Sequence, residues 1–258
     1  MTDDRLNKLL FLVKNIATTA FQKLSELHKE NLFTYSYSKD VPREMKAEVD
    51  NIIEDLIINS LKETGLPILS EETGSLEGES NSKLRFIIDP IDGTVNFIRG
   101  LAPATISIAL YEENKPLFGV LAVYPSGDLV WGGKGMGAFK NNQPIEVSKI
   151  NDLSDSVLCT GIPSRFDLDN KNSSINFYKS LASYAKIRML GSASNSLLQV
   201  AKGSAEVYSE DEIMLWDVAA GLAIVEGAGG VVFVSPGKSV YSINVYASNG
   251  VVNKVWKK

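Results

Sequence analysis

Cysteine and histidine are almost absent from this sequence. Its 258 residues include one cysteine, Cys159, and one histidine, His28. A single cysteine excludes an internal disulfide and argues against a zinc site built on cysteine. A single histidine leaves the most frequent general base almost unavailable. We expect Cys159 to be a small buried residue of a strand and His28 to have no catalytic part, so any chemistry must come from other side chains.

Long apolar runs and an excess of positive charge are also missing. No stretch reaches the roughly 18 apolar residues that a membrane span needs. The early acids Asp3 and Asp4, followed by an amphipathic pattern, do not fit a signal peptide. The formal net charge of -5 argues against a general nucleic-acid binder or a protein of anionic membrane surfaces. We therefore expect a cytoplasmic protein that binds neither nucleic acid nor membrane.

The first 150 residues have the pattern of an α+β half. Apolar residues at helical spacing predict a helix over residues 2–29. A second helix is expected after an Asp40 cap, with Pro42 in its first turn and Gly65 at its end. A short strand over residues 66–69 follows, and it leads into two glutamates. Antiparallel, hairpin-rich strands are then expected over residues 104–112, 117–124, 128–133 and 137–147.

From about residue 151 the pattern changes to strands that alternate with helices. Strands are expected over residues 157–160, 187–190, 205–209 and 231–234. Helices are expected over residues 173–185, 194–202 and 217–226. Such alternation favours an α/β half, residues 151–258, behind the α+β half, residues 1–150. Because no repeat or low-complexity linker separates the halves, we expect them to pack as one compact unit.

Carboxylates follow the ends of several expected elements. In the stretch RFIIDPIDGTVNF, residues 85–97, an apolar strand leads directly into Asp89 and Asp92. Asp50, Glu71 and Asp217 occupy comparable places at other elements. Like charges this close resist ionisation, and a bound divalent cation removes that cost. Hard oxygen ligands of this kind suit Mg²⁺.

Each acid also has an ordinary structural interpretation. Asp92 would cap the helix that begins near Gly93, and Asp217 would cap the helix that follows it. Asp50 would form a helical salt bridge with Lys46. Glu71 and Glu72 would be charged side chains of a solvent-exposed loop. The metal hypothesis therefore depends on the set of acids rather than on any one of them.

Gly93 and Thr94 add a second kind of chemistry to this stretch. A glycine lets an anion approach the backbone, and the amides at a helix N-terminus face that anion with the positive end of the helix dipole. The Thr94 hydroxyl can orient a water molecule. Carboxylates for metal, a helix end for phosphate and a hydroxyl for water together indicate metal-assisted hydrolysis of a phosphate ester.

The motifs DPIDGTVNF and WDVAAG, more than 120 residues apart, resemble those of the inositol monophosphatase family of Mg²⁺-dependent, lithium-sensitive phosphatases. SEE precedes the first motif and GSASNS precedes the second, in the order of the family. The resemblance extends from residue 1 to about residue 250. It implies a layered αβαβα fold, two or three Mg²⁺ ions in each active site and a homodimer.

The resemblance also implies metal ligands. Glu71, Asp89 and the carbonyl of Ile91 would hold the first metal. Asp89, Asp92 and Asp217 would hold the second, which would stabilise the leaving alkoxide.

The same resemblance implies catalytic roles for three residues. Glu71 and Thr94 would position the attacking water, while the amides of Gly93 and Thr94 hold the phosphate. Asp50 matches the acid that hydrogen-bonds toward this threonine in the family. The family often carries threonine three residues before that acid, where this chain has Ala47.

Substrate contacts are implied at the start of a helix and on a strand. Gly191, Ser192 and Ala193 match a segment whose backbone meets substrate hydroxyls. Glu210 matches a glutamate that contacts inositol, with a surface charge as the alternative. Arg188 would reach the substrate or a neighbouring subunit, or else pair with a surface acid.

The resulting prediction is a phosphomonoesterase that hydrolyses inositol monophosphate or a related small sugar or polyol phosphate. A 3'-phosphoadenosine 5'-phosphate phosphatase is an alternative with the same chemistry, as are phosphatases of histidinol phosphate and fructose 1,6-bisphosphate. A regulatory binding protein on the same fold is an alternative of a different class.

Overall fold

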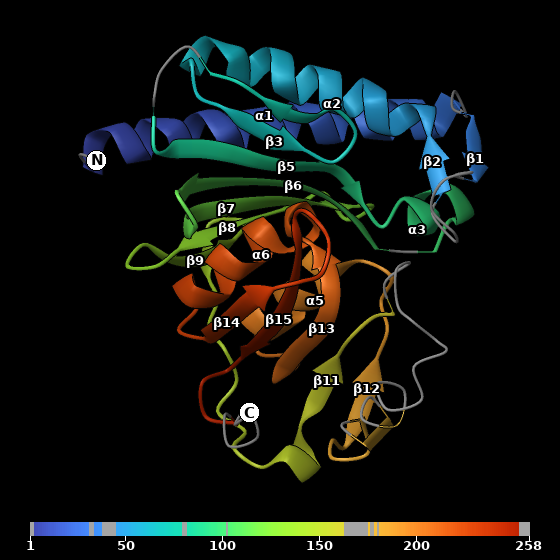
Figure 1. Cartoon of the computed structure of the whole chain (residues 1–258), viewed down its shortest axis with the longest axis vertical. Coiled ribbons are helices and arrows are strands. Elements are labelled where there is room, and N and C mark those ends of the chain that lie inside the picture. The colour runs from blue at the N-terminus through green and yellow to red at the C-terminus, as the bar shows by residue number, and fades with distance from the viewer. Residues whose placement is uncertain are drawn as a thin grey trace.

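A computed structural model describes residues 3–30, 34–37, 45–78, 82–101, 103–162, 175, 178–179 and 181–252. These residues form layers of helices and sheets (Figure 1). The helices are α1 (Asp3–Glu30), α2 (Glu48–Leu61), α3 (Thr94–Arg99), α5 (Ala193–Ala201) and α6 (Leu215–Gly227). Short 3₁₀ turns occur at Lys62–Thr64 and Leu153–Asp155.

The first sheet has eight strands in the order β10-β9-β8-β7-β6-β5-β3-β4, and a separate hairpin is formed by β1 (Tyr35–Tyr37) and β2 (Met45–Ala47). All neighbours in the eight-stranded sheet are antiparallel except β3 and β5. Its strands are β3 (Ile68–Ser70), β4 (Gly74–Leu76), β5 (Leu84–Asp92), β6 (Ala104–Glu112), β7 (Lys115–Tyr124), β8 (Asp128–Gly133), β9 (Gly137–Lys140) and β10 (Gln143–Pro144).

The second sheet has five strands in the order β12-β11-β13-β15-β14. The strands β12, β11 and β13 are parallel, whereas β13, β15 and β14 pair antiparallel. Its strands are β11 (Val157–Cys159), β12 (Lys186–Arg188), β13 (Val207–Met214), β14 (Val231–Pro236) and β15 (Ser242–Ser248). The expected boundary near residue 150 therefore falls between the two sheets, and the division into halves stays a prediction.

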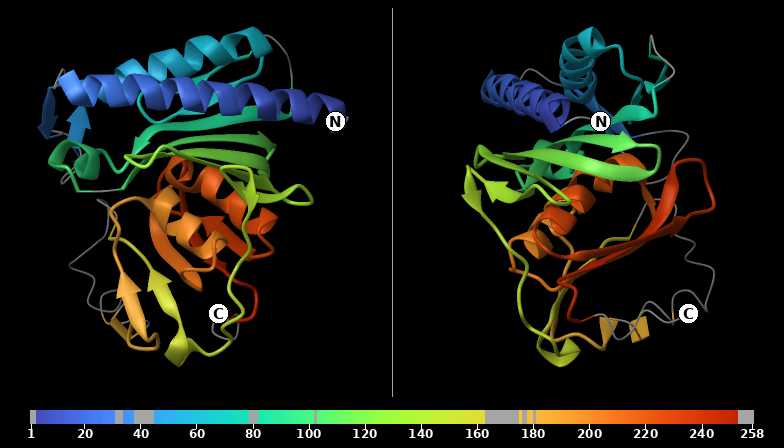
Figure 2. Two further views of the ribbon diagram at one scale, coloured as in Figure 1. Left: turned by 180° about the vertical axis from the view of Figure 1, so that it is seen from behind. Right: turned by 90° about the vertical axis from the view of Figure 1, so that its left-hand side faces the viewer.

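The layers alternate as the resemblance implied. Helices α1 and α2 cover one face of the large sheet, and α5 and α6 lie between its other face and the second sheet (Figures 1 and 2). This mixed, layered α+β fold confirms the predicted class. Of the helix expected over residues 173–185, which would add the outermost layer, residues 175, 178, 179 and 181 are helical and residues 182–185 are not, while the other five lie outside the described residues.

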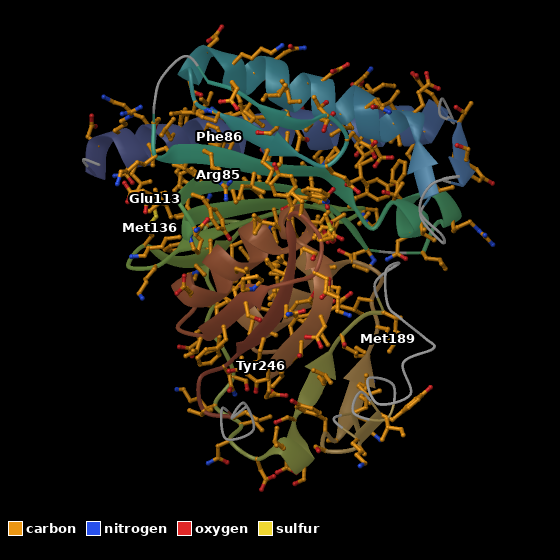
Figure 3. The ribbon with its side chains drawn as sticks, viewed as in Figure 1. Arg85, Phe86, Glu113, Met136, Met189 and Tyr246 are labelled. Atoms are coloured by element: carbon orange, nitrogen blue, oxygen red, sulfur yellow. The ribbon has the colours of Figure 1, made fainter. Side chains whose placement is uncertain are left out.

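Successive side chains of β5 pack into two different hydrophobic cores, one on each face of the large sheet. Phe86 (labelled in Figure 3) and Ile88 pack into the core beneath α1 and α2. Ile87 lies in the second core, with residues of α5 and α6. Because successive side chains of a strand point to opposite faces, a strand buried on both sides is apolar throughout. The same strand therefore fixes its carboxyl end between both layers of helices.

Two sequence-based boundaries differ clearly from the structure, and one strand was not expected. The second helix begins at Glu48 rather than near residue 42, because residues 45–47 pair with β1 and the Asp50 carboxylate accepts a hydrogen bond from the Ala47 amide. Asp40 and Pro42 lie outside the described residues. Strand β13 continues past Ser209 to Met214, since β15 supplies backbone partners along its length. That central strand, β15, was not expected at all.

None of the helices among the described residues combines the length and the apolar character that a membrane crossing requires.

Helix α6 packs unusually close to the large sheet at Gly119 of β7. A Cβ atom at Gly119 would overlap the backbone of Ala220. We predict that Gly119→Ala lowers the free energy of unfolding by about 1–3 kcal/mol, the usual cost of overpacking a core. Gly135→Ala is the control, because its Cβ would meet nothing within 4 Å and only the positive φ of 79° opposes it. A denaturant midpoint of Gly119→Ala equal to that of the wild type would contradict the close packing.

Candidate active site

A bulge at the end of β5 places two aspartates on one face of the sheet. Asp89 pairs with Ser107 of β6, and Asp92 pairs with Thr105. The two aspartates are therefore three residues apart on β5, whereas their partners are only two residues apart on β6. In a regular strand, residues three apart point to opposite faces. The extra residue restores the same side for Asp89 and Asp92. Both carboxylates are buried.

Glu71 lies beside them because β3 runs parallel to β5. Ser70, the last residue of β3, pairs with Ile88, so Glu71 leaves the sheet next to Asp89. The carboxyl groups of Glu71 and Asp89 share a hydrogen bond. Glu71 is thus part of the acidic cluster rather than a solvated loop charge.

Glu54 of α2 fixes the loop that carries Glu71, and the sequence-based reasoning did not identify it. Its buried carboxylate accepts hydrogen bonds from the amides of Glu72 and Thr73, both at 3.1 Å. It also accepts hydrogen bonds from the hydroxyls of Ser70 and Thr73. The available signal was an acid on the buried stripe of an amphipathic helix.

Asp50 and Thr94 meet across the two layers. The Thr94 hydroxyl lies 3.1 Å from Asp50 Oδ1 and 3.0 Å from the carbonyl oxygen of Ile91. A hydroxyl has one proton, so it donates to one of these acceptors at a time and keeps its lone pairs available. Asp50 is buried, and its other oxygen accepts from the Ala47 amide at 3.2 Å. The side chain of its alternative partner, Lys46, lies outside the described residues.

Asp92 faces the beginning of α5. Its carboxylate accepts from the Ser192 hydroxyl at 2.7 Å, the Ala193 amide at 3.2 Å, and both the amide (2.7 Å) and the hydroxyl of Ser194. The idea that Asp92 caps the helix at Gly93 is therefore wrong, since α3 has no side-chain cap. Asp92 instead links the large sheet to α5.

Asp217 lies in the first turn of α6. Its carboxylate accepts a hydrogen bond from the backbone of Met214, the residue that precedes the helix. Asp217 is therefore the third residue of α6 and not its N-cap, which is Met214, so the capping interpretation is wrong. The same carboxylate is repelled by Glu71 and Asp92, which places it in the acidic cluster as well.

Burial and mutual repulsion dominate the electrostatics of the cluster. Burial first, and then neighbouring carboxylates, raise the pKa of Glu71 to about 8 and hold the pKa values of Asp89 and Asp217 well above their usual range. Burial raises the pKa of Asp50 to about 7, although Thr94 opposes the shift. Among the described residues, no lysine or arginine forms an ion pair with any of these acids.

The donor chemistry of this cluster suits a hard divalent cation, but its side chains do not form a ready cage. In the ranges that the structure describes, no group of three or more His, Cys, Asp or Glu side chains is arranged to hold a metal ion. Glu71 and Asp89 hydrogen-bond to one another, and Asp92 is turned toward α5. Buried oxygen donors without a basic partner fit such a cation in charge and type.

Gly93 has a left-handed backbone conformation. It precedes α3 with a φ of 93°, a conformation that favours glycine. A Cβ atom here would lie 3.1 Å from the Gly191 carbonyl oxygen and 3.3 Å from that of Pro103. The start of α3 is thus in close contact with the segment that leads into α5.

Asn96 of α3 holds these segments together, and the sequence-based reasoning missed it. Its buried Nδ2 donates to the carbonyl oxygens of Pro103 at 2.8 Å and Leu190 at 2.7 Å. The Asn96 backbone carbonyl accepts from the Leu101 amide at 2.8 Å. One side chain therefore aligns the loop before β6 with the loop before α5.

The predicted substrate contacts occupy different surroundings. Glu210 is buried on β13 and accepts from the Tyr208 hydroxyl at 3.0 Å, so the surface-charge interpretation is wrong. Burial raises the pKa of Glu210 to about 7. Ser192 and Ala193 are buried at the start of α5, and Gly191 is exposed. Arg188 is exposed and donates to the Ile187 carbonyl at 2.9 Å; its substrate role stays a prediction.

The sequence matches the inositol monophosphatase family over residues 6–258. It is 33% identical over 221 residues to a Mesorhizobium japonicum protein named inositol-1-monophosphatase, covering 84% of this chain and 83% of that one. It is 34% identical over 221 residues to the Nus factor SuhB of Xylella fastidiosa, covering 84% of this chain and 76% of the relative. The crystal structure of the extragenic suppressor protein suhB from Bartonella henselae superposes with a TM-score of 0.84 at 29% identity, covering 95% of each chain.

We predict that Asn96→Asp lowers the free energy of unfolding by about 3 kcal/mol, because a carboxylate would face two carbonyl oxygens without a donor. Asn59→Asp, on the exposed side of α2, is the matched control and should change stability by no more than about 0.5 kcal/mol. Urea unfolding of both variants measures the difference. Equal, small effects would show that the Asn96 hydrogen bonds do not hold the two loops together.

The metal-free protein should lose stability as the pH rises from 6 to 8. The folded pKa values of Asp50 and Glu71, about 7 and about 8, exceed the roughly 4 expected in the unfolded chain. In this range the folded state therefore binds more protons than the unfolded state, and deprotonation destabilises it. We expect Tm in EDTA to fall by at least about 2 °C from pH 6 to pH 8.

A reduced dependence in Asp50→Asn is the control for that experiment, because the change removes one of the two titrating groups and also a charge that raises the pKa of Glu71. A Tm that is constant or rises over the same interval would contradict the proposed repulsion.

Proposed function

The chain belongs to the inositol monophosphatase family, and on this basis we propose that it is a Mg²⁺-dependent phosphomonoesterase acting on inositol monophosphate or a related small sugar or polyol phosphate. The observation that carries the proposal is the cluster of Glu71, Asp89, Asp92 and Asp217, which has no basic partner among the described residues; Asp89 and Asp92 are buried, and Glu71 and Asp217 are half-buried. Structural acids have no reason to accumulate such repulsion, whereas ligands of a divalent cation do.

The metal would be held by Glu71, Asp89, Asp92, Asp217 and the carbonyl oxygen of Ile91, with two or three Mg²⁺ ions in each site. When bound, Mg²⁺ neutralises these carboxylates, activates water and polarises the phosphate. The Asp92 carboxylate would keep its orientation through the hydroxyls and amides at the start of α5.

The attacking water would be oriented by Thr94 and Glu71. The Thr94 hydroxyl has an acceptor on each side, Asp50 and the Ile91 carbonyl, so its position is set by the protein before a water arrives. Asp50 would act through Thr94 rather than on the substrate. A hydroxyl fixed in this way orients water without reorganisation during the reaction.

The phosphate would lie against the amides of Gly93 and Thr94 at the start of α3. The hydroxyls of the substrate would meet Glu210 and the backbone of Gly191 and Ala193. Glu210 is already oriented by Tyr208. A buried carboxylate is a strong acceptor for a sugar or inositol hydroxyl, which favours a polyol phosphate over a nucleotide. 3'-Phosphoadenosine 5'-phosphate is the nearest alternative substrate, and histidinol phosphate and fructose 1,6-bisphosphate are further ones.

A regulatory binding protein is the second candidate, because one relative is named a Nus factor and a similar solved structure an extragenic suppressor protein. The intact set of mutually repelling acids favours the enzyme, since a protein with no metal to bind gains stability by losing them. Inhibition by lithium, a homodimer and a cytoplasmic location are further proposals that follow from the family resemblance.

The test is phosphate release, with Mg²⁺ and with EDTA, from inositol 1-phosphate, 3'-phosphoadenosine 5'-phosphate, histidinol phosphate and fructose 1,6-bisphosphate. We expect Mg²⁺-dependent turnover of inositol 1-phosphate that falls at least about 100-fold in Asp89→Asn, since one electrostatic contact is typically worth that much. Asp155→Asn, in an exposed 3₁₀ turn, should keep full activity.

Undiminished turnover in Asp89→Asn would refute the metal assignment. If folded protein supplied with Mg²⁺ releases no phosphate from any of the four substrates, the result would favour the regulatory candidate.

A further inference from the structure

A cavity of about 510 Å³ lies between the large sheet and the second half of the chain, apart from the acidic cluster. One wall comes from the end of β7 and from β8 and β9, and the other from β11, β12 and α5. Met189, labelled in Figure 3, directly follows β12 and does not line the cavity. None of the predicted metal ligands lines the cavity.

The lining of this cavity is positive in a protein whose formal net charge is -5. Lys140, Arg188 and Lys202 face it, against one acid, Asp128. Asp128 is already engaged, since it pairs with Lys140 at 2.8 Å and accepts from the Asn141 amide group at 2.7 Å. Within the described residues, neither Arg188 nor Lys202 forms an ion pair. Two cationic side chains are therefore available to a ligand.

One face of α5 forms a wall of the cavity. Asn195, Leu198, Gln199 and Lys202 line it, and their spacing places them on one side of a helix. Gln199 Nε2 donates to Asn195 Oδ1 at 2.9 Å, which ties two of these side chains together. The first turn of the same helix donates to Asp92 in the acidic cluster. Helix α5 thus contacts the cavity along its side and the predicted active site at its end.

A second connection runs through Asn96. Pro103 and Leu190 both line the cavity, and their carbonyl oxygens are the two that accept from Asn96 Nδ2. A molecule in the cavity would press on the loops that Asn96 aligns, next to Gly93. Both connections reach the active site without any residue of the cavity being one of its predicted metal ligands.

We propose that this cavity binds a small phosphorylated metabolite as an effector, and that occupancy acts on the active site through α5. Its volume matches sites for small molecules rather than for a bare ion. A guanidinium and an ammonium group without carboxylate partners recognise phosphate, and Asn195, Gln199 and Ser126 supply polar contacts for the rest of the ligand. The binding does not depend on the proposed function, because it needs neither metal nor turnover.

The test is a titration of the full-length, ¹⁵N-labelled protein in EDTA with glucose 6-phosphate, using glucose as the uncharged control. Without metal, the acidic cluster repels phosphate, so binding there is suppressed. We expect glucose 6-phosphate, but not glucose, to shift the amide signals of residues 195–204 and 126–140. Lys202→Gln should weaken this binding about tenfold, the effect of one charge-assisted hydrogen bond. Lys62→Gln, in the 3₁₀ turn after α2, is the matched control and should not change it.

Three results would overturn the proposal: no shifts at millimolar glucose 6-phosphate, shifts confined to residues 89–94, or equal affinity in wild type and Lys202→Gln. Absence of shifts is also the result expected if a second copy of the chain covers the cavity. A circular dichroism spectrum confirms that each variant is folded, and Lys140→Gln provides a second cavity variant whose affinity should also fall.

Discussion

Repulsion between buried carboxylates is the constraint on which the rest of this structure depends. Glu71, Asp89, Asp92 and Asp217 come from three different elements and meet where burial already opposes their ionisation. Without a cation, the chain can keep them together only by sharing protons, as Glu71 and Asp89 do, or by surrounding them with donors, as α5 does for Asp92. A fold that keeps these carboxylates together despite their repulsion is suited to a bound cation, which would remove that repulsion.

Hydrogen bonds with side chains in other layers of the fold hold the acids and their loops in place. Glu54 of α2 fixes the loop of Glu71, and Asp50 of α2 holds Thr94 at the start of α3. Asn96 aligns the loops before β6 and α5. The predicted active site is thus shared between the helices above the large sheet and those below it. The same sharing connects it to the positive cavity along α5.

Sequence reasoning found the acids because each follows an apolar element directly, and the spacing of Asp89, Asp92 and Asp217 within recognisable motifs identified the family. It missed Glu54 and Asn96, since their partners are backbone groups that only the folded chain brings within reach. The bulge between Asp89 and Asp92 was equally hidden, because it appears only in the register with β6. Strand β15 was missed although its partner β14 directly precedes it in the chain; its other partner, β13, is brought beside it only by folding.

The central claim is that these carboxylates are ligands of a divalent cation, and anomalous scattering tests it most directly. Crystals soaked in Mn²⁺, a stand-in for Mg²⁺ with a usable absorption edge, should give anomalous difference peaks among Glu71, Asp89, Asp92 and Asp217. The Glu71 carboxyl should then have turned from Asp89 toward the metal. Well-ordered carboxylates with no peak among them at saturating Mn²⁺, or peaks only elsewhere on the molecule, would contradict the account.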